Sequence, residues 1–482
     1  MATYTAAAGG GNWSDDATWG GSGHPVAGDV ALLDATSGAV TVDVDSACTT
    51  LDLTGYTSTL ALGTYALTVS GNVTIGTTVG SLATLTIGIS GGTGLTVGGD
   101  LLVALRGVIT CSGASKISCA GSWDVSAGTF TKSTGTVTFN ATASGKTVKS
   151  GSNTYYNVTW NGSGGEWTLQ DNFTQTRAVA FTAGTIILNL KMYTASYLQT
   201  VTLGNGFSLT VGAGLCYLYG VNITIPTGAS VTVSTGTFYP FALTVSGTGT
   251  LAASGAATIL CGGSVNISSS NFSAGTSTLY SYQLGGAVTL SSAEPLYNYH
   301  VCHPNGDANV TVTLLSSLVV INNFTILASA GKTRSFSAGS NTLTIGGNFA
   351  NGDTFNAGTG TVILNDATKV TTVTGSTTFN ILSITTPDKV VRFTAGTTQT
   401  VASFVATGTA GHLVTLNNVT GASTWAISDA SGVNSVSYSS IAHSAAAGGA
   451  SWQAYLSNGN VNGGTNSGWD FSGFPALLLG GD

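Results

Sequence analysis

Charged residues are scarce in this chain of 482 residues. Asp, Glu, Lys and Arg together make up 6% of it, against about a quarter in an ordinary soluble domain. A coiled coil or helical bundle is excluded, because the Glu, Lys and Arg of helix surfaces are missing. Hydrophobic residues make up 42% and are regularly spaced, which excludes a charge-rich disordered protein. With 12 basic and 19 acidic residues, the net charge is −7, which argues against nucleic-acid binding.

Long hydrophobic runs are also missing. Mean hydropathy is +0.32, yet no stretch approaches the roughly 20 apolar residues of a membrane-spanning helix. Residues 1–6 have no basic segment followed by an apolar one. We therefore expect neither membrane insertion nor export by the general secretory route. The abundant residues are Gly, with 68 positions, and Thr and Ser. They indicate an all-β protein whose solvent face is built from Thr, Ser, Asn and Gly.

The cysteines form no recognisable framework. Six are scattered along the chain, and none lies in a CxxC pair: Cys48, Cys111, Cys119, Cys216, Cys261 and Cys302. We expect free thiols that behave as small buried apolar residues. A bridge between Cys111 and Cys119 is the one alternative, and it requires successive strands to place them side by side.

A short motif recurs along the chain. Leu-Thr-Val or Leu-Thr-Ile, followed by a small residue, begins at Leu67, Leu95, Leu209, Leu243 and Leu343. Each copy predicts a strand with apolar residues on one face and Thr on the other, ending where the chain turns.

A longer repeat starts near residues 121, 263 and 347. Each copy contains a Gly-led strand, then an aromatic residue, then a second strand, and an aromatic–Asn pair about sixteen residues later. The three pairs end in Asn157, Asn298 and Asn380. Three matches in the same order indicate three copies of one supersecondary unit.

Repeated short strands with Gly, Asn and Ser corners predict an elongated, all-β solenoid of the parallel β-helix type. Coils of about 20–25 residues would give roughly 20 coils. Equivalent positions of stacked coils lie about 4.8 Å apart, so repeated charges would repel, whereas Thr, Ser and Asn can form hydrogen-bonded ladders. A string of small β-sandwiches is the alternative fold.

Both ends differ from the middle, as terminal repeats of solenoids do. We expect an N-terminal cap or attachment region over residues 1–50, the repetitive solenoid over 51–440, and a C-terminal cap with an apolar tail over 441–482. Trp13 and Trp19 at one end, with Trp452 and Trp469 at the other, could cover the exposed core. The tail 474–479 either packs on the last coil or inserts into a partner.

Few residues could carry catalysis. Asp43 and Asp45, two apart, could form a carboxylate pair on one strand face. The alternative, a polar outer face, is favoured because no His, Arg or Lys is close in sequence. We therefore predict no enzyme, no catalytic residue and no cofactor.

One ligand-rich cluster stands out, at His300, Cys302 and His303. In a strand His300 and Cys302 would share a face, and His303 begins a turn. Soft N and S ligands at this spacing suit zinc or iron. A structural metal normally needs four ligands and no second cluster completes the set, so we favour a strand end with a polar turn over a metal site.

Three segments resemble known proteins. The opening Gly11-Asn12-Trp13-Ser14, with Pro25-Val26-Ala27-Gly28-Asp29, resembles the start of large surface and virion proteins of bacteria and their phages. Residues 135–140 and 343–349 resemble coils of haemagglutinin-like and adhesin-like β-solenoids. Residues 435–471 are similar to the end of right-handed β-helix proteins encoded with phage structural genes. Together these segments resemble phage-encoded virion proteins of the β-solenoid type.

The resemblance and the missing export signal together imply a virion component: a tail fibre, a tail spike, or a fibre or decoration on the capsid. It would be assembled in the host cytoplasm and exposed on the particle, with other virion proteins as partners. Fibres of this kind are often homotrimers, so the resemblance implies a homo-oligomer, with a solenoid that stands alone on its own closed core as the alternative. The implied task is structural and adhesive. Aromatic side chains that could stack on host glycans are Trp160, Trp167, Tyr217 and Tyr219. A place in the core or at coil corners is the favoured position for them.

Two other functions remain open. A glycan-degrading tail spike or secreted polysaccharide-acting enzyme would release oligosaccharides from host polysaccharide. A secreted bacterial adhesin would have its gene beside that of a secretion partner.

Overall fold

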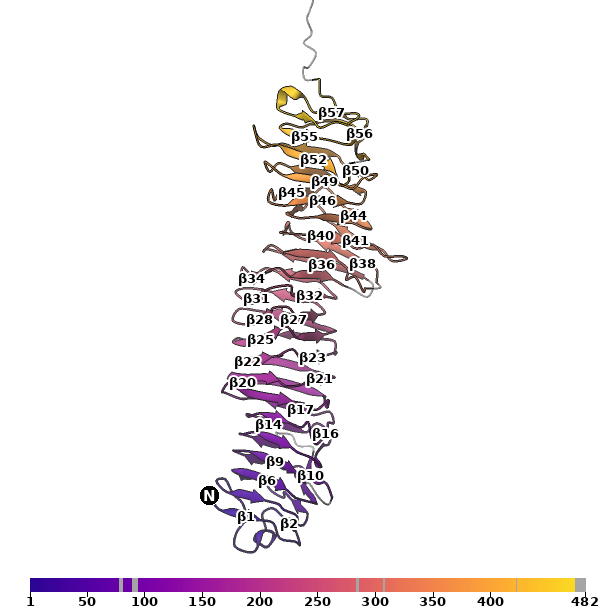
Figure 1. Ribbon diagram of the computed structural model, residues 1–482. Coiled ribbons are helices and arrows are strands. Elements are labelled where there is room, and N and C mark those ends of the chain that lie inside the picture. The colour runs from indigo at the N-terminus through magenta and orange to yellow at the C-terminus, as the bar shows by residue number, and fades with distance from the viewer. Residues whose placement is uncertain (78–80, 89–93, 283–285, 307, 422, 473–482) are drawn as a thin grey trace, which may run out of the picture. The chain divides into compact units, whose positions relative to one another are not determined.

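A computed structural model describes residues 1–77, 81–88, 94–282, 286–306, 308–421 and 423–472. The chain is nearly all-β, and its parallel stacked sheets form a β-solenoid of about 19 turns (Figure 1). The predicted fold class is confirmed, and the coil number is close to the expected one. The alternative of separate β-sandwiches is wrong, because strands pair in parallel with those of the next coil. The expected apolar tail lies outside the described residues.

The chain divides into two compact units. The first comprises residues 1–241 with 247–252, and the second comprises 242–246 with 253–482. Strand β31 (Thr250–Ala253) lies at the division.

Four sets of parallel strands build the first unit. The largest contains β1 (Thr3–Thr5), β3 (Val30–Leu32), β5 (Ser46–Cys48), β6 (Thr50–Thr54), β8 (Leu67–Val69), β9 (Val73–Gly76), β11 (Leu95–Val97), β12 (Leu101–Val103), β14 (Lys116–Cys119), β15 (Trp123–Asp124), β17 (Thr136–Phe139), β18 (Lys146–Lys149), β20 (Asn157–Leu169), β22 (Val179–Ile187), β25 (Phe207–Gly212) and β28 (Ser230–Val233). The second contains β2 (Gly11–Asn12), β4 (Val40–Thr41), β7 (Thr59–Ala61), β10 (Ala83–Ile87), β13 (Gly107–Cys111) and β16 (Thr129–Thr131). The others contain β19 (Thr154–Tyr155), β21 (Phe173–Gln175), β23 (Met192–Ala195), β26 (Leu215–Leu218) and β29 (Thr237–Pro240), and the pair β24 (Gln199–Thr202) and β27 (Val221–Ile225).

The second unit is built in the same way. One set contains β32 (Thr258–Cys261), β35 (Thr278–Ser281), β37 (Asn298–Val301), β40 (Phe324–Ile326), β43 (Phe349–Asn351), β46 (Val370–Thr374), β49 (Val390–Phe393), β52 (Val414–Asn418), β55 (Ser439–Ile441) and β58 (Val461–Asn462). A second set contains β30 (Leu243–Val245), β33 (Val265–Ile267), β36 (Gly286–Ser292), β38 (Val310–Leu314), β41 (Arg334–Ser337) and β44 (Thr354–Asn356), and β34 (Phe272–Ser273) also lies in this unit. The remaining sets are β39 (Leu318–Val320), β42 (Thr342–Ile345), β45 (Thr361–Leu364), β48 (Ile381–Ile384) and β51 (Ser403–Ala406); β47 (Thr377–Thr378), β50 (Thr398–Thr400), β53 (Trp425–Asp429) and β56 (Ser444–Gly448); and β54 (Val433–Ser435) with β57 (Ser451–Gln453).

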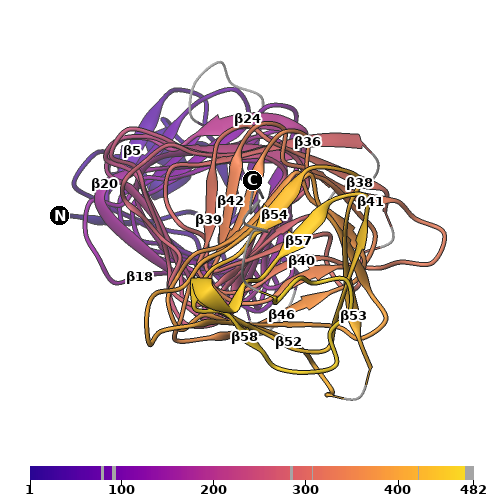
Figure 2. The same cartoon turned by 90° about the horizontal axis from the view of Figure 1, so that it is seen from above.

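Seen along the stack, the sheets of the second unit surround its interior. Figure 2 shows β46, β52 and β58 on one side, β53 on another, and β39 with β42 on a third. The only helical segments among the described residues are the short 3-10 turns η1 (Asp16–Trp19) and η2 (Leu456–Asn458). No helix in the described part of the chain is both long enough and apolar enough to span a bilayer.

Alternation along each strand decides which residues are buried. In β8 and β11, Leu67 pairs with Leu95 and Thr68 with Thr96, so the short repeat stacks on itself in register. Both Leu side chains have no exposed area. The adjacent Thr residues face outward, where neutral hydroxyls of neighbouring coils approach without charge repulsion. Equivalent residues of the short sequence motif therefore pair with one another on neighbouring coils.

Corners are held by side-chain acceptors one coil apart. In the second unit, Asn298 Oδ1 accepts the backbone N–H of Asn323, Asn323 Oδ1 accepts that of Asn348, and Asn348 Oδ1 accepts that of Thr372. The N–H groups of Asn323 and Asn348 lie just before β40 and β43, and that of Thr372 lies within β46. An Asn oxygen satisfies each of them, so Asn acceptors follow one another from coil to coil.

Large aromatic side chains fill the interior of the first unit between β15 and β25. Phe139 stacks on Trp160 with ring centroids 4.3 Å apart. Phe173 lies between Tyr155, at 4.6 Å, and Tyr193, at 5.4 Å, with nearly parallel planes in both pairs. Equivalent inward positions follow one another along the stack, so rings repeated in sequence pile on one another.

Tryptophans near both ends of the described chain are buried in pairs. Trp13 and Trp19 make an edge-to-face contact with centroids 4.9 Å apart, and the Trp19 indole N–H donates to the Trp13 carbonyl at 2.8 Å. Trp452 and Trp469 make a similar contact at 5.1 Å. All four side chains are buried, so each pair adds apolar cover to its own unit.

A fully buried lysine was not anticipated. Lys389, just before β49, has no exposed area. Its ammonium donates to three backbone carbonyls, those of Gly346, Asp366 and Lys369, at 3.2, 2.7 and 3.0 Å. Burial lowers the pKa of Lys389 to about 8, partly opposed by the nearby Asp366 carboxylate. The side chain acts as an internal donor for a corner where three carbonyls converge.

All six cysteines are free and buried. The expected thiol state is confirmed, and the alternative of a Cys111–Cys119 disulfide is wrong. Cys111 ends β13 in one sheet and Cys119 ends β14 in another.

Candidate binding surface

Tyr217 and Tyr219 lie on the outer side of the first unit. Leu215, Cys216, Tyr217 and Leu218 form β26, in which Cys216 and Leu218 point into the core and Tyr217 points outward. Tyr219 follows the strand, and both tyrosines are half-buried. The alternation of apolar and tyrosyl positions therefore leaves one edge or face of each ring accessible.

The two rings form a small platform with a third tyrosine. Tyr217 and Tyr219 have ring planes only 8° apart and centroids separated by 5.9 Å. Tyr239 pairs with Tyr217 in the register of β26 and β29 and meets its ring edge-on at 5.0 Å. We call Tyr217, Tyr219 and Tyr239 the tyrosine platform. Parallel aromatic rings on a rigid strand offer an apolar surface with polar hydroxyl ends, which suits the C–H face of a sugar ring.

Two tryptophans that the sequence offered as glycan-stacking candidates occupy the core instead, the position that the sequence favoured. Trp160 and Trp167, both on β20, have no exposed area. The Trp160 indole N–H donates to the Tyr193 hydroxyl at 3.2 Å inside the core. A Cβ added at Gly184 would lie 2.8 Å from Trp167 Cζ3, so the backbone of the next coil closes over this ring. Neither side chain can reach a glycan, and both belong to the core.

His300, Cys302 and His303 do not share the geometry expected of them. Strand β37 ends at Val301, and Cys302 has φ +72° with a buried side chain. His300 and Cys302 therefore do not lie on one strand face. The rings of His300 and His303 both pack edge-on against Tyr280, with centroids 5.1 and 4.9 Å away.

The electrostatics at this corner favour neutral groups. Burial lowers the pKa of His300 to about 4, with a further contribution from His303. Burial raises the pKa of the Cys302 thiol, which also favours its neutral form. Within the described ranges, no three His, Cys, Asp or Glu side chains lie close enough to hold a metal ion. The cluster is built as an aromatic corner of the second unit.

The paired aspartates also have a different setting from the one considered. Strand β4 ends at Thr41, and residues 42–45 bend instead of continuing as a strand. The Asp43 carboxylate accepts the backbone N–H of Ser14 at 3.0 Å and its hydroxyl at 2.6 Å, and these bonds lower its pKa. Asp45 accepts the backbone N–H of Ala66 at 2.8 Å. Each carboxylate therefore joins a different pair of coils, and the shared strand face is wrong.

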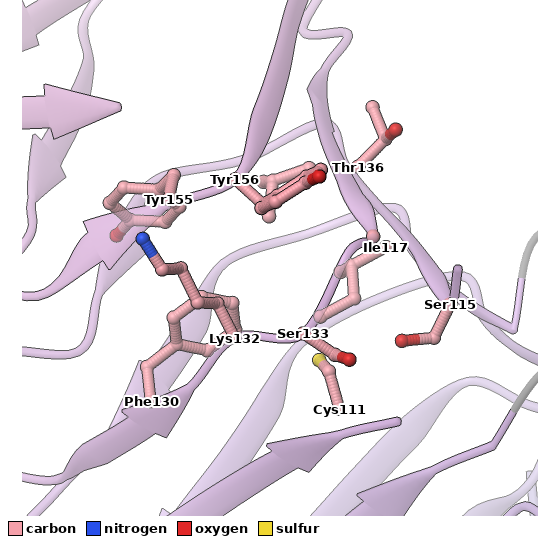
Figure 3. A pocket seen from close by; sticks show the side chains of 11 residues that line it. Cys111, Ser115, Ile117, Phe130, Lys132, Ser133, Thr136, Tyr155 and Tyr156 are labelled. Carbon is pink, nitrogen blue, oxygen red and sulfur yellow. The ribbon is translucent and has the colours of Figure 1, made fainter. Parts of the chain in front are cut away.

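A small cavity lies inside the first unit beside β13 and β16. Its volume is about 10 Å³, and its lining includes Cys111, Ser115, Lys132 and Ser133. Figure 3 shows the hydroxyls of Ser115 and Ser133 and the thiol of Cys111 turned towards the same space. That volume holds about one water molecule. Burial raises the pKa of Cys111 to about 11, so its thiol stays protonated at neutral pH and is no nucleophile.

Two functional candidates escaped the sequence reading. Tyr239 is buried, and it supports the platform from the next coil through the register of β26 and β29. Arg177 lies over the rings of Tyr156 and Tyr197, at 5.7 and 5.3 Å from their centroids. The residues in contact within each group lie about 20 positions apart in the sequence, or one coil. Aromatic and Arg residues repeated at that spacing are the sequence signal that points to both sites.

Comparison of the chain with protein-family models, with curated proteins and with solved structures gave no match.

Proposed function

We propose that the protein is a non-enzymatic structural component of a bacteriophage virion, a tail fibre or spike or a capsid fibre or decoration, that attaches to host surface glycans. The observation that carries the adhesive part is the tyrosine platform, with Tyr217 and Tyr219 parallel and half-buried on one coil. A rigid support presents such rings without an ordering cost on binding. The virion part rests on the resemblance of the opening, the coils and the close of the sequence.

The use of carboxylates supports a scaffold. Asp43, Asp100 and Asp171 each accept backbone N–H groups from another coil. Hydrogen bonds hold the pKa of Asp34 and Asp43 below the ordinary value. A general acid in glycoside hydrolysis needs the opposite shift, a raised pKa. These aspartates are suited to tying coils together.

Binding to purified host capsule or lipopolysaccharide tests the adhesive function. We expect the wild type to bind and the Y217A/Y219A double variant to bind about tenfold more weakly, since each lost ring contact costs about 0.5–1.5 kcal/mol. Tyr65 is 41% exposed in the same unit, so Y65A is the matched control and should bind like the wild type. Equal binding by Y217A/Y219A and wild type would overturn the platform.

Two further measurements address the alternatives. Release of oligosaccharides from the same polysaccharide, lost on substitution of a single Asp, would establish an enzyme instead. Labelled antibody should decorate intact phage particles from the source strain at a fixed position. Undecorated particles, with a gene lying beside a secretion partner, would establish the adhesin. Light scattering on the full chain reports whether it forms the proposed homo-oligomer.

A further inference from the structure

An arginine is clamped between two tyrosines at one corner of the first unit. Tyr156 follows β19, Arg177 follows β21 and Tyr197 follows β23, which are neighbouring strands of one sheet. The guanidinium carbon lies 5.7 Å from the centroid of Tyr156 and 5.3 Å from that of Tyr197. Both distances are within the range of cation–π attraction, so the two rings hold the guanidinium.

The backbone under Arg177 is pinned as well. Its N–H donates to the Tyr156 carbonyl at 2.9 Å. Its carbonyl accepts from the side-chain amide of Gln175 at 3.2 Å, and Gln175 has no exposed area. The main chain and the side chain of Arg177 are thus both positioned before any ligand arrives.

The N–H groups of the Arg177 guanidinium are available to a ligand. Arg177 and Tyr197 are exposed, the latter by 38%. Among the described residues, the Arg177 side chain makes no hydrogen bond or ion pair, although acidic residues outnumber basic ones 19 to 12 in the chain. A second cation lies close by, because Lys132 Nζ donates to the hydroxyl of Thr176 at 3.1 Å. The Lys132 ammonium therefore contacts the residue directly before Arg177.

This corner continues towards the tyrosine platform. The register of β23 and β26 pairs Tyr193 with Cys216, which sets Tyr219 one coil beyond Ser196. A Cβ added at Gly220 would lie 3.6 Å from the carbonyl carbon of Tyr197. The two sites are therefore parts of one edge, with coils about 4.8 Å apart.

We propose that Arg177, clamped by Tyr156 and Tyr197 and flanked by Lys132, binds the carboxylate of an acidic glycan whose neighbouring sugars stack on the tyrosine platform. The inference rests on the proposed function, since it names the class of glycan. A planar guanidinium fork matches a carboxylate in a bidentate manner, which makes this arginine selective for a sugar acid over a neutral sugar. Tyrosine rings beside the fork contact the sugar ring that bears the carboxylate.

The test uses the full chain and two matched probes, oligogalacturonate and its methyl ester, in calorimetric titrations. We expect the wild type to bind the acid at least tenfold more tightly than the ester. R177Q should lose this preference while keeping its affinity for the ester, and R177K should recover part of it. R392Q is the control, because Arg392 is exposed on β49 in the other unit. Unchanged thermal unfolding of R177Q separates binding from folding.

The results distinguish this inference from the proposed function. An unchanged acid preference in R177Q, with glycan binding still lost in Y217A/Y219A, overturns the Arg177 site and leaves the platform standing. Loss of preference in R177Q, with no effect of Y217A/Y219A, supports the Arg177 site and overturns the platform. Wild type that binds acid and ester equally, or binds neither probe, overturns the inference. Competition by millimolar inorganic phosphate at constant ionic strength, equal to that by the acid, would show a general anion site and overturn selectivity for a sugar acid.

Discussion

We expect Lys389 to raise the free energy of unfolding of the second unit as the pH increases from 8 to 10. The ordinary lysine pKa of 10.5 applies to the unfolded chain, and burial lowers the value in the folded protein to about 8. Between these two pH values the unfolded state holds a proton that the folded state has released. Stability therefore rises with pH in this window.

The magnitude follows from the two pKa values. A difference of about 2 to 3 pH units, at about 1.4 kcal/mol for each, corresponds to about 3 kcal/mol in total. From pH 7 to pH 10 the gain is about 2 to 3 kcal/mol, because the unfolded state has not finished titrating at pH 10. The Lys389→Met variant has no such group, so it should show no corresponding gain.

Urea unfolding of wild type and K389M at pH 7, 8, 9 and 10 measures this effect. Every other titrating group is common to both proteins, so the difference between them isolates Lys389. We expect the free energy of unfolding of the wild type to rise by about 2 to 3 kcal/mol relative to K389M over this range. Equal changes in the free energy of unfolding of wild type and K389M with pH would refute the reasoning. The surroundings of the buried ammonium would then not lower its pKa.

Three more predictions concern the core, a corner and an aromatic cluster. Phe173→Ala should cost about 3–5 kcal/mol, because its ring is stacked from both sides; urea unfolding should show this loss, whereas Thr174→Ala on the outer face of the same strand should stay within about 0.5 kcal/mol. Asn323→Ala removes the acceptor of the Asn348 backbone N–H, and hydrogen exchange of that amide should accelerate by about tenfold, corresponding to about 1.4 kcal/mol; an unchanged rate would contradict the corner role. The pKa of His300 is lowered to about 4, so the free energy of unfolding that neutral His300 contributes is lost as the pH falls from 6.5 towards 4. In urea titrations between pH 7 and pH 4.5, the partly exposed His300 should make the wild type lose about 2 kcal/mol more than His300→Gln. Equal losses would contradict this prediction.

The solenoid was predictable because its signal is local and repeated. Leu67 and Leu95 begin identical motifs, and identical motifs stack when each coil pairs with the next. Alternation also predicted the outward Thr residues. Stacked coils favour neutral hydrogen-bonding residues such as Asn at equivalent positions, and Asn298 and Asn323 occupy two of them.

Side-chain direction inside a long strand was harder to predict. Trp160 and Trp167 lie seven positions apart on β20, and both point inward because the register shifts between Trp160 and Asn161 and again before Glu166. Simple alternation places residues seven apart on opposite faces. A bulge breaks that rule locally, and the sequence carries no clear sign of it beyond its glycines.

Contacts between coils were the other missing information. Arg177 meets Tyr156 and Tyr197 only because three coils of nearly equal length bring one corner into line. Lys389 collects carbonyls from residues 20 to 43 positions away. The exact length of each coil decides such meetings, and composition and periodicity leave that length uncertain by several residues.

The six buried thiols can report local unfolding of the coils in which they lie. Cys48, Cys216 and Cys261 lie on different coils, and burial raises the pKa of each thiol. A thiol of this kind reacts with an alkylating agent only while its own coil is open to solvent. The six labelling rates, separated by peptide mass, would rank the coils by their opening free energies without any engineered probe.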